Sequence, residues 1–309
     1  MRRITQAAVA AVSAFLFIAS PALAADKPDA APSADKPKPP ADKPDLPPFP
    51  ADASVHQTLH VGARTLNYTA TVGSLPVRDA DGKKIAEVVF TAYVLDGPRD
   101  PNRRVTFAFN GGPGASSVYL NMGAIGPKRI QFGAQGDSPS DPVQLHDNPG
   151  TWLDFTDLVF IDPVGTGFSR SLVKQEETDK QFFMIESDIS YLSRVVYDWL
   201  TKNGRMASPK YVVGESYGGY RAPAISHYLQ TKMGVGVSGV VMVSPALDGR
   251  SAADPDTSPM SWVATLPSMA AANYERQGKT LTEGETALIK ENVRFDITLH
   301  GPAIMSEPS

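Results

Sequence analysis

The chain has 309 residues, enough for one large α/β domain or two smaller ones. Hydrophobic residues make up 42% of it and charged residues 20%, which excludes a chain that is disordered throughout. The net charge of −4 predicts no nucleic-acid partner, because such binding depends on a basic surface. The absence of cysteine excludes disulfides, thiolate zinc sites and a cysteine nucleophile.

Residues 1–24 have the pattern of a signal peptide. Arg2 and Arg3 precede an apolar run over residues 7–19, which is too short to span a bilayer comfortably, and Ala22-Leu23-Ala24 has the form of a cleavage site. We therefore predict export to the periplasm or the medium, with no membrane attachment after cleavage. A retained membrane anchor is the alternative.

A proline-rich linker is predicted over residues 25–51. Its segment 25–50 holds nine of the 27 prolines, and Ala-Asp-Lys-Pro occurs there three times. Proline at this density removes amide donors and favours an extended, solvated chain without a fixed fold. A tether is therefore expected here, with a binding role for the repeat as the alternative.

Residues 52–248 are predicted to form an α/β core. Segments 66–72 and 85–95 are rich in β-branched and aromatic residues and flank an Asp-Gly turn at 79–82, which predicts antiparallel strands. Strands and helices then alternate, and the strands are apolar almost throughout, which indicates a mostly parallel sheet buried on both faces. Strands are expected at 105–110, 157–162, 211–214 and 237–244, and helices at 179–203 and 219–233.

The pattern changes after the core. Prolines, methionines and polar residues mix over 255–269, a helix is predicted over 282–293, and no further buried strand is evident.

Gly214-Glu215-Ser216-Tyr217-Gly218-Gly219 is the strongest local motif. It follows a short apolar strand and opens a helix, which is the arrangement that a nucleophile elbow requires. The tight turn is expected to strain the backbone of Ser216, and the glycines to avoid collisions with the neighbouring strand and helix. An ordinary turn between a strand and a helix is the alternative.

Two further glycine-rich blocks follow predicted strands. Asn110-Gly-Gly-Pro-Gly-Ala-Ser-Ser117 can offer backbone amides to an oxyanion. A phosphate-binding loop is the alternative there, but no Lys-Ser or Lys-Thr follows, which disfavours Walker chemistry. The other block is Phe160-Ile-Asp-Pro-Val-Gly-Thr-Gly-Phe-Ser169.

Together, in this order and spacing, the three blocks resemble the serine carboxypeptidase family over roughly residues 60–250. The resemblance implies an α/β-hydrolase fold and the release of single residues from peptide C-termini through an acyl-enzyme. It implies that Ser216 is the nucleophile and that the N–H groups of Gly112 and Tyr217 form the oxyanion hole. It also implies that the substrate-binding residues are Asn110, Gly111 and Glu215. Of these, Asn110 and Glu215 would hold the substrate's terminal carboxylate.

A protonated Glu215 can donate a hydrogen bond to that carboxylate, whereas an ionised one would repel it. The implied partners are peptides with a free C-terminal carboxylate. No metal or cofactor is expected, since the histidines lack ligand-like spacing. The oligomeric state is left open.

The chain departs from the family pattern in several places. Ala115 stands where many members have cysteine, and Ala124 stands where some relatives have a second glutamate. His227 is expected to lie too far along the helix that follows Ser216 to act as its base. His300, with Asp248 or Asp296 as its partner, is a weak candidate.

We therefore expect the N-terminal part of a longer enzyme, with an incomplete core, the start of a helical cap insertion over 249–309, and the triad Asp and His beyond residue 309. An esterase-type hydrolase and an inactive hydrolase-like binding protein are the alternatives. His56, His60 and the His146-Asp147 pair are expected on the surface or in solvated loops.

Overall fold

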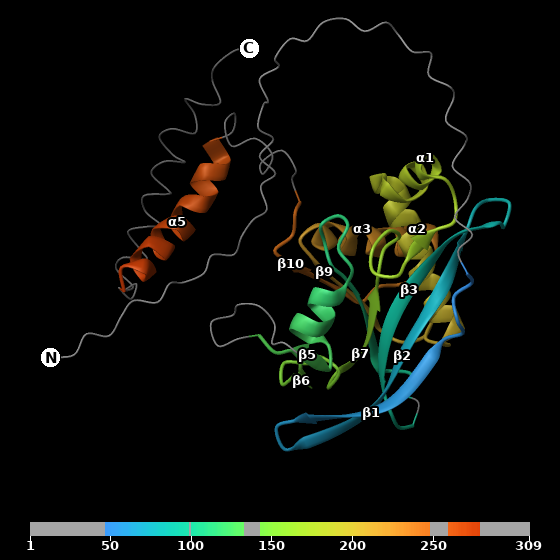
Figure 1. The fold of residues 1–309 in the computed structure, drawn as a ribbon, viewed down its shortest axis with the longest axis horizontal. Coiled ribbons are helices and arrows are strands. Elements are labelled where there is room, and N and C mark those ends of the chain that lie inside the picture. Colours follow the sequence, from blue (N-terminus) through green and yellow to red (C-terminus); the bar gives the residue numbers. More distant parts are fainter. Residues whose placement is uncertain (1–46, 99, 133–142, 248–258, 279–309) are drawn as a thin grey trace, which may run out of the picture. The chain divides into compact units, whose positions relative to one another are not determined.

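The computed structural model describes residues 47–98, 100–132, 143–247 and 259–278 (Figure 1). The chain divides into two units, one of residues 10–245 and the other of residues 1–9 with 246–309. The described part of the second unit contains helix α5 (Pro259–Arg276). The sheet and the candidate site belong to the first unit.

Three long antiparallel strands begin the fold: β1 (Ala53–Val61), β2 (Arg64–Arg78) and β3 (Lys84–Leu95). The predicted turn between β2 and β3 is confirmed. Asp79 Oδ1 accepts hydrogen bonds from the amides of Asp81 and Lys83, and the amide of Gly82 donates to the carbonyl oxygen of Asp79. This Asx-type turn fixes the register of the hairpin.

Four parallel strands continue the sheet: β7 (Thr156–Ile161), β4 (Arg104–Phe109), β9 (Lys210–Glu215) and β10 (Gly239–Val243). The eight-stranded sheet has the order β1-β2-β3-β7-β4-β9-β10, with β8 (Arg170–Ser171) paired to β3. Within the described part of the chain β10 is an edge strand, and the side chains of Val240 and Met242 are 38% and 46% exposed.

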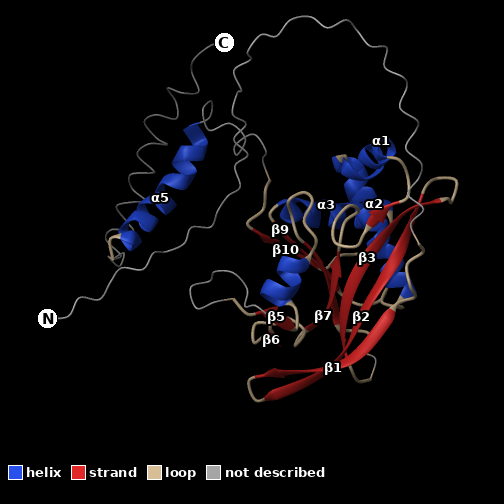
Figure 2. Cartoon of the chain, in the orientation of Figure 1, coloured by secondary structure: helices blue, strands red, loops and turns tan. Residues whose placement is uncertain are grey.

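Both faces of the central strands β3, β7, β4 and β9 are buried, as the apolar strands predict. Figure 2 shows helices packed against the sheet. Helices α2 (Ile185–Lys202) and α3 (Tyr217–Lys232) pack on the same face, where Trp199 meets Phe107 edge to face. The other face is covered by a short π-helix, η1 (Leu120–Ile125), and by Leu153. Antiparallel strands leading into a parallel sheet, with a strand–Ser–helix turn after β9, make this the predicted α/β-hydrolase fold.

The helix predicted over 179–203 is interrupted. Helix α1 (Gln175–Thr178) runs directly into a π-helix, η2 (Asp179–Phe183). An extended Met184 then separates η2 from α2. The break lets the Phe182 ring pack edge to face on Tyr191, at 5.2 Å between ring centroids. An amphipathic spacing continues across the break, which is why the sequence pattern conceals it.

Two other expectations differ from the structure. The sequence predicted no particular helix over 255–269, where the structure has most of α5; its start at Pro259 agrees with the tolerance for proline in a first helical turn. His146 and Asp147, expected in a solvated loop, lie in strand β6 (Leu145–Asp147), which pairs with β5 (Lys128–Ile130). The helix predicted over 282–293 lies outside the described residues.

The last residues of the predicted linker contact the core. Arg170 Nη2 donates to the carbonyl oxygen of Pro47 at 2.5 Å, and its guanidinium lies 3.9 Å from the centroid of the Phe49 ring. Residues before 47 lie outside the described part of the chain.

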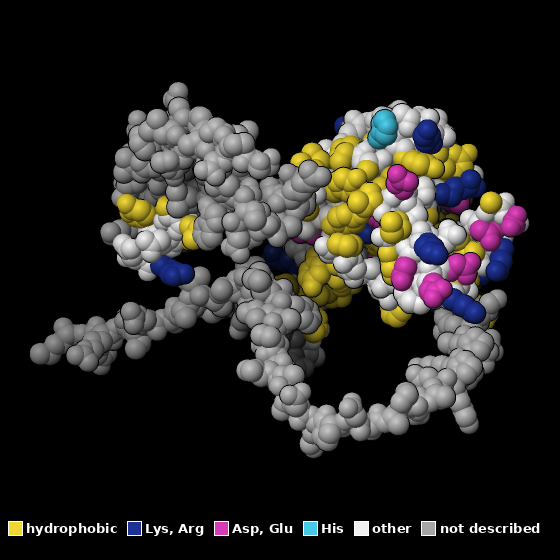
Figure 3. Space-filling model, turned by 90° about the horizontal axis from the view of Figure 1, so that it is seen from above, with side chains coloured by type: hydrophobic (Ala, Val, Ile, Leu, Met, Phe, Trp, Pro, Cys, Tyr) yellow, Lys and Arg dark blue, Asp and Glu magenta, His cyan; other side chains and the backbone are white. Residues whose placement is uncertain are grey.

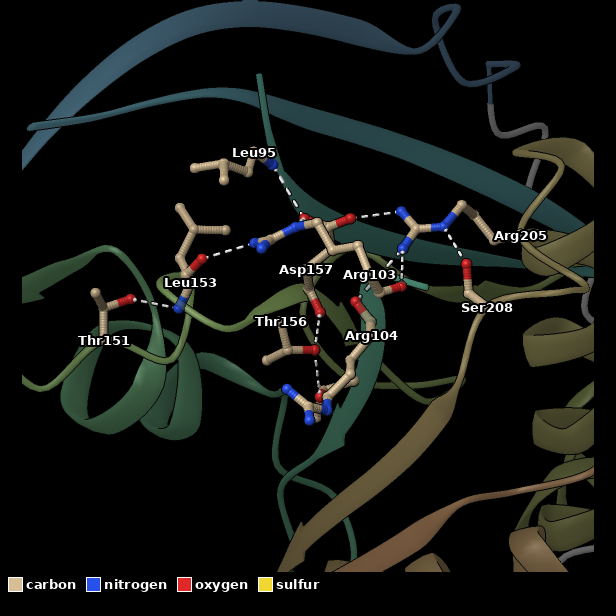
Figure 4. Close-up of polar contacts among 10 residues, drawn as sticks. Leu95, Arg103, Arg104, Thr151, Leu153, Thr156, Asp157, Arg205 and Ser208 are labelled. Carbon is tan, nitrogen blue, oxygen red and sulfur yellow. Dashed lines mark hydrogen bonds and ion pairs between the residues drawn. The ribbon is translucent and has the colours of Figure 1, made fainter. Parts of the chain in front are cut away.

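A buried ionic network lies where the parallel strands β7, β4 and β9 begin (Figure 4). The three glycine-rich motifs lie at the other end of these strands. Asp157, whose side chain is 1% exposed, binds Arg103 Nε at 2.7 Å and Arg205 Nη1 at 2.5 Å. Its Oδ1 also accepts the amide of Leu95 at 3.0 Å. One carboxylate thus joins β3 and β7 to the segments that precede β4 and β9.

Replacing Asp157 with alanine should lower the free energy of unfolding by about 3–5 kcal/mol, because two largely buried guanidinium groups lose their counter-charge. Urea unfolding followed by circular dichroism measures this. Asp198→Ala is the matched control: its pair with Arg194 is more exposed and should contribute no more than about 1 kcal/mol. Equal losses for the two variants would contradict the assignment.

Glu87 should make stability depend on pH. Burial alone would raise the pKa of Glu87, but hydrogen bonds from Lys84 and Arg170 outweigh it and lower the pKa below 4.5. This stabilisation should be complete above the unfolded value of 4.5 and lost as the pH falls through the lower folded value. Urea unfolding measures the difference in the free energy of unfolding between the parent and Glu87→Gln. This difference should be larger at about pH 7 than at about pH 3. A difference that grows at low pH would contradict this sign.

Candidate active site

Ser216 lies on a strained turn between β9 and α3, as the motif predicts. Its φ of 57° and ψ of −120° place a non-glycine residue in a region that costs of order 1–3 kcal/mol. Its amide donates to the carbonyl oxygen of Val243 on β10, and its carbonyl oxygen accepts the amide of Gly219, both at 2.9 Å. Ser216 is half-buried, so it is neither enclosed in the core nor fully exposed to solvent.

The glycines around Ser216 are required by close contacts between backbone atoms. A Cβ at Gly214 would lie 1.8 Å from the carbonyl oxygen of Gly218, and one at Gly218 would lie 2.2 Å from that of Phe109. A Cβ at Gly219 would lie 2.7 Å from Pro245. All three distances are below any that real side chains show, so this strand–turn–helix packing admits glycine alone.

The loop after β4 packs directly on the elbow. A Cβ at the buried Gly111 would lie 2.6 Å from the amide nitrogen of Tyr217 and 2.7 Å from Cβ of Ser216. The next residue, Gly112, is exposed and has a φ of 108°. No acceptor for the amide of Gly112 is found among the described residues, and Tyr217 begins α3, where amides have no partner within the helix. Both amides can therefore serve an incoming oxygen.

Asn110 and Glu215 contact each other, as the resemblance requires of two residues that share one ligand. Asn110 Nδ2 donates to Glu215 Oε2 at 3.2 Å, and Asn110 Oδ1 accepts the amide of Leu120 at 2.9 Å. Asn110 is 1% exposed, so both ends of its amide group are fixed. Glu215 is half-buried and keeps access to solvent.

The third block supports the first. The amide of Ser117 donates to Asp162 Oδ1 at 2.8 Å, and Ser117 Oγ donates to the carbonyl oxygen of Ile161 at 2.6 Å. Burial raises the pKa of Asp162. A Cβ at Gly167 would lie 2.2 Å from Asp162 Oδ2, so the turn folds tightly over this carboxyl. The block that looks structural in sequence therefore holds the glycine-rich loop in place.

Sequence reasoning missed a buried ion pair beneath the elbow. Arg221 binds Asp188 through two hydrogen bonds of 2.7 and 3.2 Å, and both side chains are about 95% buried. Arg221 Nη1 also donates to the carbonyl oxygen of Asn110 at 3.2 Å, and its guanidinium lies 4.7 Å from the centroid of the Tyr217 ring. Burial raises the pKa of Asp188, an effect that Arg221 opposes. An arginine only five positions after Ser216, on a helix that packs against the sheet, was the available signal.

No histidine in the described part of the chain contacts Ser216. His227 lies on the exposed side of α3. His56 bonds to Asp96, and His60 bonds to Thr65 and Asp147. His146 is exposed in β6. His300, Asp248 and Asp296 lie outside the described residues. The geometry therefore brings together a candidate nucleophile and an oxyanion cradle, while the described residues supply no base.

Within those same residues, no group of three His, Asp or Glu side chains is placed to hold a metal ion. None of the described helices combines the length and the apolar character needed to cross a bilayer.

Replacing Gly218 with alanine should disrupt the elbow, because the new methyl group meets a backbone carbonyl that cannot move aside. We expect a loss of about 3 kcal/mol in the free energy of unfolding. Gly123→Ala is the control, since a Cβ there finds no atom within 4 Å, and it should change stability by no more than about 0.5 kcal/mol. Chemical denaturation of both variants measures this, and a neutral Gly218→Ala would contradict the packing described.

Comparison with known proteins gives a consistent family. The family model described as serine carboxypeptidase matches residues 89–283. "Serine carboxypeptidase-like 50" of Arabidopsis thaliana is 31% identical over 159 residues, which cover 51% of this chain and 33% of the plant protein. "Pheromone-processing carboxypeptidase kex1" of Pyrenophora tritici-repentis is 32% identical over 126 residues, covering 40% of this chain and 18% of the fungal protein.

Among solved structures, the prohormone-processing carboxypeptidase Kex1 of Saccharomyces cerevisiae aligns with a TM-score of 0.49 and 19% identity. The alignment covers 73% of this chain and 52% of the yeast chain. The chain thus spans about half or less of the length of the relatives that it matches.

Proposed function

The chain belongs to the serine carboxypeptidase family, and we propose that it carries the nucleophile and oxyanion hole of a peptidase that releases C-terminal residues from peptides. The observation that supports this most directly is the strained Ser216 packed against the glycine loop, with a Cβ at Gly111 only 2.7 Å from Cβ of Ser216. Strained backbone clusters at active sites, so the strain at the half-buried Ser216 beside these amides supports a catalytic role.

In the proposed reaction Ser216 Oγ attacks the carbonyl carbon of the last peptide bond. The oxygen of that carbonyl becomes negative and accepts hydrogen bonds from the amides of Gly112 and Tyr217. Because Tyr217 begins α3, the partial positive charge of the helix N-terminus adds to this stabilisation. The C–N bond then breaks, the released residue leaves with a proton on its amine, and the acyl-enzyme on Ser216 is hydrolysed by water.

Asn110 and Glu215 are proposed to bind the terminal carboxylate of the substrate. Asn110 Nδ2 has a second hydrogen besides the one donated to Glu215, and a protonated Glu215 can donate as well. An ionised Glu215 would repel the carboxylate, so this role predicts better binding at acidic pH.

Activation of Ser216 requires a general base, which we propose lies outside the described residues. Removing the base and its partner from such a site leaves only the rate enhancement of the oxyanion hole and of binding. Export through residues 1–24 is part of the proposal, since the arginines and the apolar run there have the pattern of a cleaved signal.

Fluorophosphonate labelling of the purified chain tests the nucleophile. The reagent forms a bond only with an activated hydroxyl, so with the triad Asp and His expected beyond residue 309 we expect weak labelling. Strong labelling at Ser216 that is absent from Ser216→Ala would show that this chain holds an activating base. Mass spectrometry of the labelled peptide locates the adduct. Failure to label a folded chain would show that this chain holds no activated serine, and labelling elsewhere would contradict the assignment.

A blocked dipeptide and its C-terminal amide distinguish a carboxypeptidase from an esterase-type hydrolase. The free carboxylate should be preferred in kcat/KM, and Glu215→Ala should reduce that preference by about ten- to hundredfold, the value of a hydrogen bond to a charged group. Equal hydrolysis of both compounds would favour the esterase-type activity. Glu87→Ala, which removes a buried carboxylate on β3 that pairs with Arg170, is a control that should leave the preference unchanged.

A further inference from the structure

Residues 47–52, which we call the strap, directly precede β1 and lie beside β2 and β3 (Figure 1). The first contact of the strap is with Arg170 of β8, whose guanidinium carbon lies 3.9 Å from the centroid of the Phe49 ring. Arg170 Nη2 donates to the carbonyl oxygen of Pro47 at 2.5 Å and to Glu87 Oε2 on β3 at 2.7 Å. The guanidinium is therefore bound by the strap and by β3 at once, and the Arg170 side chain is only 18% exposed.

The second contact explains a glycine in the middle of β2. A Cβ at Gly73 would lie 2.5 Å from Cγ of Asp52, so the Asp52 carboxylate occupies the space that a side chain at this position would fill. Asp52 Oδ2 also binds Lys202 Nζ, at the C-terminal end of α2, at 2.6 Å. Glycine in a strand interior weakens the strand and often marks the close approach of another segment. Here that segment is the strap.

The spacing of the two contacts along the strap matches their spacing along the sheet. Phe49 and Asp52 are three positions apart in the sequence. On β3, Glu87 lies at the first contact, and Phe90, the partner of Gly73 in the register with β2, lies at the second, again three positions apart. Extended chain rises about 3.3 Å per residue in both segments. One extended segment, which its prolines favour, can therefore make both contacts together.

A charged pair alone would not select this segment. Lys202 and Asp52 are 43% and 30% exposed, and exposed pairs add little to stability. Figure 3 shows acidic and basic side chains scattered over the described surface, so such pairs could form in many places. The ring of Phe49 and the space left by Gly73 supply the specificity that the pair lacks.

The first contact leads toward the glycine-rich loop. Ser169 directly precedes Arg170, and its Oγ accepts the amide of Val89 at 2.7 Å and donates to the carbonyl oxygen of Asp162 at 2.6 Å. Asp162 Oδ1 in turn accepts the amide of Ser117 at 2.8 Å. A continuous series of contacts thus joins the strap to the loop after β4.

Strand β8 gains much of its order from the strap. It has two residues, and its pairing with β3 consists of Ser171 with Ala86 and Arg170 with Glu87. Strand pairing on this small scale is marginal in water. The strap adds a stacked ring and a hydrogen bond to Arg170, and so holds the side chain through which β8 is fixed to the sheet.

We propose that the strap is an intramolecular clamp, which docks on Arg170 and Gly73 and immobilises β8, the turn over residues 162–169 and, through Asp162, the glycine-rich loop. Detaching the strap should loosen this loop without unfolding the sheet. Residues 47–51 are then part of the fold, in contrast to the solvated tether expected there from the sequence. The inference concerns the order of the loop and does not depend on catalysis.

Hydrogen–deuterium exchange of the purified chain, followed by mass spectrometry, tests the clamp. Phe49→Ala removes the ring on Arg170, and Gly73→Ala places a methyl group where the Asp52 carboxylate lies. Asp52 is exposed and can move aside, so the sheet should stay intact. Each variant should raise the exchange rate over residues 110–118 and 163–172 at least fivefold, while the amides of β4 and β9 exchange as in the parent.

Phe155→Ala and Gly123→Ala are the matched controls. Phe155 is 49% exposed and packs on Trp152, and a Cβ at Gly123 finds no atom within 4 Å. Both should exchange like the parent over the two reporter segments. Phe49→Tyr, which keeps a ring face for the guanidinium, should also exchange like the parent.

Thermal unfolding shows whether each variant is folded, and Asp52→Ala replaces Gly73→Ala if the latter is not. Parent-like exchange over 163–172 in either anchor variant would overturn the clamp. Equally faster exchange in β4 and β9 would also overturn it, because that pattern reports a general loss of stability. Faster exchange over 163–172 with no change over 110–118 would overturn the link to the glycine-rich loop.

Discussion

The candidate site depends on the approach of backbone to backbone where β9 turns into α3. The carbonyl oxygens of Gly218 and Phe109 occupy the positions where side chains of Gly214 and Gly218 would lie, and the Gly111 loop fills the space beside Ser216. Strain at Ser216 persists because these contacts determine the turn from several sides at once. The hydroxyl and the amides beside it are thus positioned by the backbone, and few side chains are needed to orient them.

Side chains contribute at a second level, by holding the loops that carry this backbone. Asp162 fixes the glycine-rich loop through the amide of Ser117, and Arg221 ties the carbonyl of Asn110 to α2 through Asp188. A buried ion pair of this kind adds little net stability compared with apolar packing, since desolvation offsets the attraction between its charges. Its geometry nevertheless specifies how the loop after β4 and the elbow helix meet.

The sequence predicted the features that depend on local rules. The strands, the Asp79 turn and the elbow follow from apolar periodicity and from glycine, and the structure confirms them. It did not predict the features that depend on tertiary contacts. The break at Met184 accompanies the packing of Phe182 on Tyr191, and the pairing of β6 with β5 places His146 in a strand. The Asp188–Arg221 pair joins two helices whose relative position no local pattern encodes.

These differences separate two kinds of constraint at the same edge of the sheet. The elbow and the loop after β4 are built from atoms that every residue shares, so their geometry tolerates almost no substitution at Gly111, Gly214 or Gly218. The cavity of about 320 Å³ that adjoins them is built from side chains of Val164, Phe183 and Tyr191, which other residues could replace without moving the backbone around Ser216. The geometry around Ser216 is therefore fixed by the backbone, whereas the walls of the adjoining cavity are formed largely by side chains.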